Sequence, residues 1–181
     1  MYTRYTASTN RNNDISNDLI AFLSVVQKCN VEFLPITWQP TLGTLGQGGS
    51  ATISQSIVNT DTSLAFKRFH DGDSDMDYSP LISEVIILSQ LPIQNHPNIV
   101  NLEGICWEIK PRTENVFPVL VFKKAAWDLQ QFMNVKEGKN MVIHDRLKIC
   151  ADIGSAIMTL HSYGISFPLI FAFWKSKMDQ M

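Results

Sequence analysis

The stretch L-G-Q-G-G-S-A-T-I at residues 45–53, followed by L-A-F-K at residues 64–67, decides how this sequence is interpreted. A glycine-rich run separates two segments whose alternating apolar and polar residues are typical of β-strands. Glycine has no side chain, so backbone N–H groups at such a turn can approach a ligand closely. A lysine on the next strand could then reach a phosphate bound beneath the turn. The order therefore suggests a nucleoside triphosphate held under a β-hairpin.

The glycine turn has three other interpretations. A dinucleotide-binding fold needs a helix directly after the glycines and an acidic residue about 20 positions later. Here residues 52–58 alternate like a strand, and Phe66 and Lys67 stand near that position. A Walker-type phosphate loop needs Gly-Lys-Ser or Gly-Lys-Thr, which does not follow. A glycine hairpin without a ligand is common, so only the surrounding sequence argues against it.

Composition indicates one globular domain without a nucleic-acid or membrane partner. The chain has 181 residues, 45% of them hydrophobic, and a net charge of -2, so no basic excess attracts nucleic acid or an anionic membrane. Its three cysteines lie far apart, which argues against a zinc site or a disulfide framework. The apolar runs 19–26 and 167–174 are too short to span a bilayer, and residues 1–18 make a poor signal peptide. We expect an intracellular protein, cytoplasmic or nuclear.

The apolar pattern predicts an α+β fold with a five-stranded antiparallel sheet. After a polar lead at residues 1–13, a helix is expected over residues 14–28, with Ser16 or Asn17 as its cap. Pro35 and Pro40 are expected to break the chain. Strands are expected on both sides of the glycine turn within residues 44–58, and over residues 63–69, 100–107 and 117–122. Helices are expected from Ser79, as a cap before Pro80, over residues 129–133, and over residues 145–163 with Asp145 as the cap.

Several motifs in succession resemble the eukaryotic protein kinase domain. After G-Q-G-G-S-A-T-I and L-A-F-K come L-I-S-E in a helix, H-P-N-I-V-N-L-E-G-I-C and P-V-L-V-F-K-K-A. Their order and spacing resemble the N-lobe and hinge of that family. The helix R-L-K-I-C-A-D-I-G-S-A-I-M-T-L-H-S-Y-G-I is similar to the one that leads into the kinase catalytic loop. The resemblance covers residues 38–165, with residues 1–37 as a polar lead and helix, and 166–181 as an atypical apolar tail. It implies an N-lobe with one helix packed on its sheet, and part of the helical C-lobe.

The resemblance implies an ATP site. Gly46 and Gly48 would approach the phosphates, Lys67 would reach the α- and β-phosphates, and apolar side chains would contact adenine. Glu84 shares a helical face with Leu81 and Leu88, and a carboxylate on a buried face needs a cationic partner. The kinase ion pair supplies Lys67 for that purpose. The complete set of implied nucleotide-binding residues is Gly46, Gly48, Ala51, Ile53, Ala65, Lys67, Phe122, Lys123 and Ala125.

The segment that enters the hinge departs from the family at one position. Phe122 would be the bulky residue at the back of the pocket, and the backbones of Lys123 and Ala125 would hydrogen-bond to adenine. Lys123 stands where many family members have an acidic residue. The backbone role does not use that side chain, so the change leaves it intact.

The residues that complete phosphoryl transfer in this family do not follow the last helix. Kinases need an aspartate that orients the acceptor hydroxyl, and an asparagine and a second aspartate that hold magnesium. After Ile165 the sequence reads S-F-P-L-I-F-A-F-W-K-S-K-M-D-Q-M, without His-Arg-Asp, Asp-Phe-Gly or Ala-Pro-Glu. This tail is either a docking segment or the product of a shifted reading frame or unspliced intron. We expect a chain that binds ATP without the magnesium ligands and without transferring phosphate.

Three functions fit these motifs. The chain is the ATP-binding part of a truncated protein kinase, a non-catalytic kinase-like module that binds a nucleotide or a regulatory partner, or an incomplete gene product. The sequence assigns no protein substrate, and it does not separate Ser/Thr from Tyr specificity.

Overall fold

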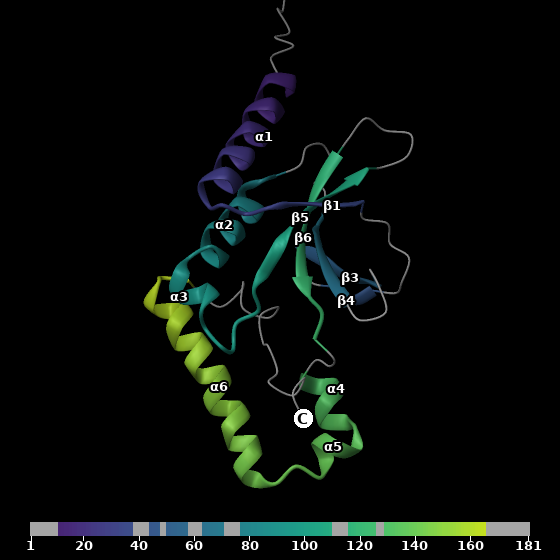
Figure 1. Cartoon of the computed structure of the whole chain (residues 1–181), viewed down its shortest axis with the longest axis vertical. Helices are drawn as coiled ribbons and strands as arrows, with labels where there is room; N and C mark the ends of the chain where they lie inside the picture. Colours follow the sequence, from purple (N-terminus) through teal and green to yellow (C-terminus); the bar gives the residue numbers. More distant parts are fainter. Residues whose placement is uncertain are drawn as a thin grey trace, which may run out of the picture.

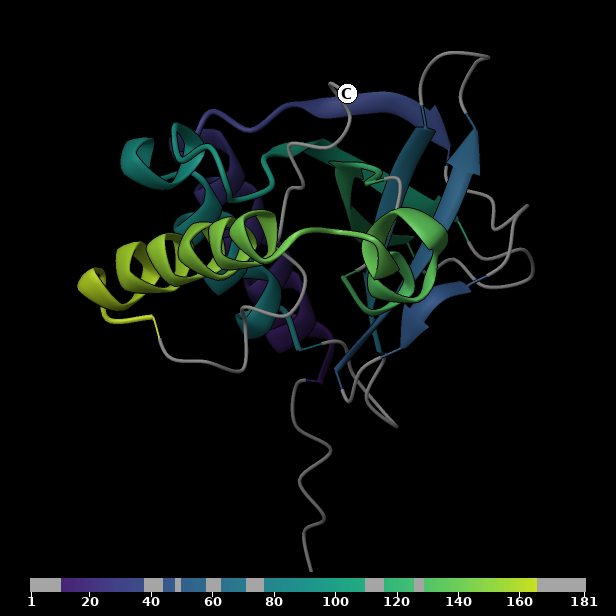
Figure 2. The same ribbon diagram turned by 90° about the horizontal axis from the view of Figure 1, so that it is seen from below.

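A computed structural model describes residues 11–37, 44–47, 50–57, 63–70, 77–109, 116–125 and 129–165. Within them a single six-stranded sheet has the order β1-β5-β6-β4-β3-β2. Helices α1 and α2 lie beside the sheet, and α4, α5 and α6 lie below it in the view of Figure 1. Seen from below, α4 and α5 lie in front of the sheet, and α6 lies in front of α1 and α2 (Figure 2). The strands are β1 (Phe33–Thr37), β2 (Thr44–Gln47), β3 (Ala51–Ile57), β4 (Ser63–Phe69), β5 (Leu102–Ile109) and β6 (Val116–Lys123), and the helices are α1 (Arg11–Lys28), α2 (Ser79–Leu88), α3 (Leu91–Gln94), α4 (Leu129–Asn134), α5 (Lys136–Lys139) and α6 (Ile143–Ser162).

Five of the six strands form the antiparallel sheet that the sequence predicted. β2 pairs with β3, β3 with β4, β4 with β6, and β6 with β5, all antiparallel. The β3–β4 ladder runs without a register shift from the pair Ala51 and Phe69 to the pair Ile57 and Ser63. This regular ladder fixes which side chains of the two strands share a face of the sheet.

The sixth strand makes the sheet mixed, so the expectation of five antiparallel strands was wrong. β1 lies at the edge of the sheet and pairs parallel with β5, with Phe33 opposite Ile105. Pro35 lies within β1, although the sequence indicated a chain break there. Proline is tolerated at a sheet edge, because one side of an edge strand has no ladder that needs its N–H.

The helix starts also differ from their predicted positions. α1 begins at Arg11, so Ser16 and Asn17 lie inside it, and residues 11–13 do not belong to a polar lead. The rest of that lead lies outside the described residues. Ser79 is the first residue of α2 and not its cap; its backbone N–H donates to Asp77 Oδ1 at 2.8 Å. α6 begins at Ile143, and Asp145 lies in its first turn and is not its cap. A carboxylate in that turn interacts favourably with the positive end of the helix dipole.

The main core lies between α2 and the sheet. Leu81, Val85 and Leu88 lie on one face of α2 and are almost completely buried, together with Ile105 and Leu120 of the sheet. Burial of each such side chain stabilises the fold by about 1.5–3 kcal/mol. This packing sets the height of α2 above the sheet. No helix in the described part of the chain is both long and apolar enough to cross a membrane.

Candidate functional site

The pairing of β3, β4 and β6 places five of the predicted site residues on one face of the sheet. Side chains at directly opposed positions of antiparallel strands point to the same side, and so do side chains two residues apart on one strand. Ile53 lies opposite Lys67, and Ala65 lies opposite Phe122. Ala51 lies opposite Phe69, which is two residues from Lys67. The glycine-turn strand, the lysine strand and the hinge strand thus contribute to one surface.

Lys67 and Glu84 form a buried ion pair at this surface. Lys67 Nζ lies 2.8 Å from Glu84 Oε1 and 2.6 Å from Glu84 Oε2. Only 8% of Lys67 and 1% of Glu84 are exposed. The ammonium also lies 5.1 Å from the centroid of the Phe69 ring, at a distance where a cation is attracted to an aromatic face. The contact between the two charged residues is the one that the sequence predicted.

The environment of Glu84 opposes its ionised form. Burial raises the pKa of Glu84 above its ordinary value, although the Lys67 ammonium and its hydrogen bond act in the opposite direction. Removing a carboxylate from water is expensive, and one partner only partly offsets that penalty. The pair therefore adds little net stability, while it fixes the ammonium at one point of the surface.

The local sequence of α2 explains why a carboxylate reaches this position. Pro80 lies in the first turn, where its missing N–H would have no partner in any case. Glu84 lies three residues after Leu81 and four before Leu88, so all three lie on the face that meets the sheet. The helix therefore carries Glu84 into the core with its apolar neighbours.

The other predicted residues that the structure describes lie on β2 and at the end of β6. Gly46 is part of β2 and lies opposite Ile53, whereas Gly48 falls outside the described residues. Phe122 is buried near the end of β6, and the exposed Lys123 is the last residue of that strand. Ala125 follows the strand and is half-buried. No nucleotide contact of these residues is established by this arrangement, so their roles stay predictions.

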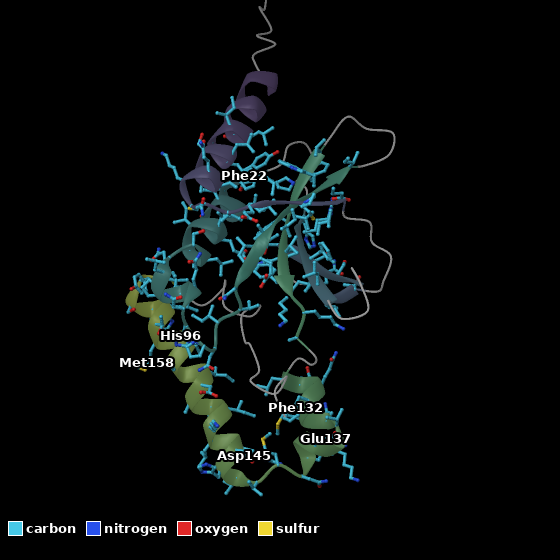
Figure 3. All side chains as sticks on the ribbon, in the orientation of Figure 1. Phe22, His96, Phe132, Glu137, Asp145 and Met158 are labelled. Atoms are coloured by element: carbon cyan, nitrogen blue, oxygen red, sulfur yellow. The ribbon has the colours of Figure 1, made fainter. Side chains whose placement is uncertain are left out.

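A second polar cluster, which sequence reasoning did not identify, ties the loop after α3 to α6. Asn98 Nδ2 donates to Asp152 Oδ1 at 3.1 Å and to the Asp152 carbonyl at 3.3 Å. His96 Nε2 lies 3.2 Å from Ser155 Oγ, and His96 Nδ1 accepts from the Asn98 backbone N–H at 3.1 Å. Figure 3 shows His96 beside α6. The partners of the H-P-N motif are 54 and 59 residues away in the sequence, so no local pattern shows them.

The described residues contain no ready-made cluster of metal-ligating side chains. Among them, no group of three or more His, Cys, Asp or Glu side chains is placed to hold a metal. Magnesium requires oxygen ligands in octahedral geometry, although it keeps several waters. Three features that suit a nucleotide do lie together: a fixed ammonium, a strand that leads into a glycine-rich turn, and an apolar face.

Comparisons with known proteins identify the family. The sequence model of the family "Protein tyrosine and serine/threonine kinase" matches residues 41–166. Wall-associated receptor kinase 5 of Arabidopsis thaliana is 31% identical over 126 residues, which are 70% of this chain and 16% of that protein. The chain thus spans about a sixth of that relative's length. An apo pseudokinase structure has a similar fold, with a TM-score of 0.52 and 19% identity over 73% of this chain and 52% of the other. The chain belongs to the protein tyrosine and serine/threonine kinase family.

Proposed function

We propose that this chain binds ATP on the sheet face that carries Lys67. The Lys67 ammonium and the backbone of the glycine turn at Gly46 and Gly48 would contact the phosphates. Ile53, Ala65 and Phe122 would enclose the adenine, while the backbones of Lys123 and Ala125 would hydrogen-bond to its edge. Ala51 would line the start of β3 next to the phosphates.

The buried ion pair between Lys67 and Glu84 is the observation that carries this proposal. Replacement of a buried pair by well-packed apolar residues is often neutral or stabilising, so stability does not explain it. An ammonium fixed by a carboxylate at a defined position is instead suited to a phosphate. Hydrogen bonds to charged groups contribute about 1.5–3 kcal/mol each.

We propose in addition that the 181-residue polypeptide does not transfer the phosphate. In its sequence, Asp179 is the only acidic residue after Ile165, and the kinase motifs that position acceptor and magnesium are absent. Phosphoryl transfer depends on that positioning and charge neutralisation. Transfer to protein Ser, Thr or Tyr is a function of kinases that carry those motifs. An intracellular location, cytoplasmic or nuclear, is part of the same proposal, since ATP is available there.

The test is a titration with a fluorescent ATP analogue, with and without magnesium. Lys67→Met should weaken binding at least about tenfold, as expected for the loss of a charge-assisted hydrogen bond. Arg68→Met is the matched control: it removes a cation from the next residue of β4, which is paired with Glu108 away from the proposed site. That variant should bind like the wild type, and magnesium should change the affinity little.

Equal affinity of the wild type and Lys67→Met would remove Lys67 as a phosphate ligand. A strong requirement for magnesium would show that metal ligands exist which this proposal lacks. Either result would reject the binding mode described above.

A further inference from the structure

Helix α2, which carries Glu84, contacts α1 as well as the sheet. Helix α1 packs against α2, and the lower end of α1 adjoins α2 in Figure 1. Phe22 and Val26, one helical turn apart on α1, are 0% and 1% exposed and belong to the same apolar cluster as Leu81 and Val85. Helix α2 is therefore supported by the sheet and by a second helix, while Ile86 on its outer side is 43% exposed.

One aromatic contact connects α1 to the start of α2. The ring of Phe22 lies 5.7 Å from the ring of Tyr78, the residue directly before α2, at an interplanar angle of 38°. Figure 3 labels Phe22 on α1. Tyr78 is only 5% exposed, and its pKa is raised by burial and by the nearby Asp18 carboxylate of α1. The residue that precedes α2 is thus buried against α1 through the contact of the Phe22 and Tyr78 rings.

The other end of α1 is anchored to the sheet independently of α2. After Asn30, with φ 53°, the chain turns into β1. The backbone N–H of Ile105 donates to the Glu32 carbonyl at 2.9 Å, and the rings of Phe33 and Trp107 stack at 5.3 Å. β1 lies so close to β5 that a Cβ atom on Gly104 would be 2.8 Å from the Glu32 carbonyl oxygen. The sheet therefore fixes the position of α1.

Helix α2 needs such support. It has ten residues, and helices shorter than about 12–15 residues are marginal in water without tertiary packing. The Lys67–Glu84 pair contributes little net stability, because burial disfavours its charges. Apolar contacts must therefore keep Glu84 beside Lys67, and α1 supplies part of them through Phe22 and Val26.

We propose that the α1–β1 segment, residues 11–37, is a brace that holds α2 where Glu84 pairs with Lys67, with Phe22 and Tyr78 as positioning residues. The segment precedes residues 41–166, which the kinase family model matches. Release of α1 would free α2 and separate the pair. The effect of the brace on nucleotide affinity rests on the proposed function, whereas its effect on α2 does not.

The first measurement is hydrogen exchange of the α2 amides in the full chain without nucleotide. Phe22→Leu keeps an apolar side chain at the position and removes the ring contact, so the variant is expected to fold. Its α2 amides should exchange at least about fivefold faster, the lower end of common coupling effects. Ile20→Ala is the matched control, since it also shortens an apolar side chain of α1 but at a position that is 57% exposed. Unchanged exchange in Phe22→Leu, or an equal increase in Ile20→Ala, would overturn the brace.

The second measurement separates positioning from general stability. Phe22→Leu should weaken binding of the fluorescent ATP analogue about fivefold in the wild-type background, and should have no further effect in a Glu84→Gln background. A loss of the same size in both backgrounds would show that Phe22 does not act through the ion pair, and would overturn its positioning role. If the wild type binds no analogue, the proposed function fails, while the exchange measurement still decides whether α1 holds α2.

Discussion

Lys67 and Arg68 are neighbours on β4, yet their ion pairs lie in different environments on opposite faces of the sheet. Lys67 pairs with Glu84 of α2, and the two side chains are 11% and 1% exposed. Arg68 pairs with Glu108 of β5 at 2.5 Å, and these side chains are 20% and 15% exposed. Two similar ion pairs, one residue apart, therefore differ mainly in burial and in the element that supplies the carboxylate.

The two pairs therefore have different roles. The Lys67–Glu84 pair positions the ammonium, and the Arg68–Glu108 pair joins two strands. Glu108 is fixed within the sheet, so its contact with Arg68 adds a link between β4 and β5 at a partly exposed site. Pairs that water can reach contribute about 0–1 kcal/mol. Glu84 lies on a helix that can move as a unit relative to the sheet. Its contact with Lys67 therefore depends on the position of α2. A movement of α2 can break the Lys67–Glu84 pair, but it leaves the Arg68–Glu108 pair in place.

The largest expected effect is on stability when one carboxylate is removed from each pair. Glu84→Ala leaves the Lys67 ammonium buried without this partner and should lower the free energy of unfolding by about 3–5 kcal/mol. Glu108→Ala should lower it by no more than about 1 kcal/mol, because water still reaches Arg68. Urea unfolding followed by circular dichroism measures both changes.

The double variant Lys67→Met/Glu84→Leu is the control for this result. Because it removes both buried charges and keeps apolar volume, it should recover most of the stability that Glu84→Ala loses. Equal losses in Glu84→Ala and Glu108→Ala would show that burial does not distinguish the two pairs.

The sequence predicted the Lys67–Glu84 pair but not the Arg68–Glu108 pair, for a physical reason. Glu84 lies within an apolar helical stripe, between Leu81 and Leu88. This local pattern predicts a buried carboxylate that needs a cation. Arg68 and Glu108 are 40 residues apart, and each alone looks like an ordinary polar residue of a strand. Only the β4–β6–β5 order brings them together.

The brace was missed for a similar reason. The sequence predicted a helix close to α1, but the periodicity of Phe22 and Val26 says only that one face is buried, not which element covers it. β1 contains Pro35, and its parallel pairing with β5 depends on a long-range return of the chain. Strand order and the contacts between α1 and α2 are tertiary information that local patterns do not contain.

The pH dependence of stability should reveal the environment of Glu84. Its pKa is raised in the folded chain above the ordinary value of 4.5, mainly by burial, so the folded state holds more protons than the unfolded state above pH 4.5. The stability of the wild type relative to Glu84→Gln should therefore be constant below pH 4.5 and fall as the pH rises through the raised pKa. The slope cannot exceed about 1.4 kcal/mol per pH unit for one group.

The measurement is urea unfolding of both proteins at a series of pH values. The difference between them isolates residue 84, since other titrating groups are common to both. A relative stability that increases with pH would mean that the attraction of Lys67 outweighs burial, and the pair would then stabilise the fold like a favourable surface contact.

The smallest expected effect concerns Phe117, the aromatic neighbour of the Arg68–Glu108 pair. The guanidinium carbon of Arg68 lies 5.9 Å from the centroid of the Phe117 ring, and at accessible sites such a contact contributes about 0.5–1 kcal/mol. In a cycle of Arg68→Met, Phe117→Leu and the double variant, the coupling energy should therefore be about 0.5 kcal/mol, well below the effect of Glu84→Ala. None of these variants should change binding of the ATP analogue, because Arg68 and Phe117 lie on the face opposite Lys67. A loss of affinity in Phe117→Leu would mean that the two faces of the sheet are coupled, and the distinction between a positioning pair and a strand-joining pair would no longer hold.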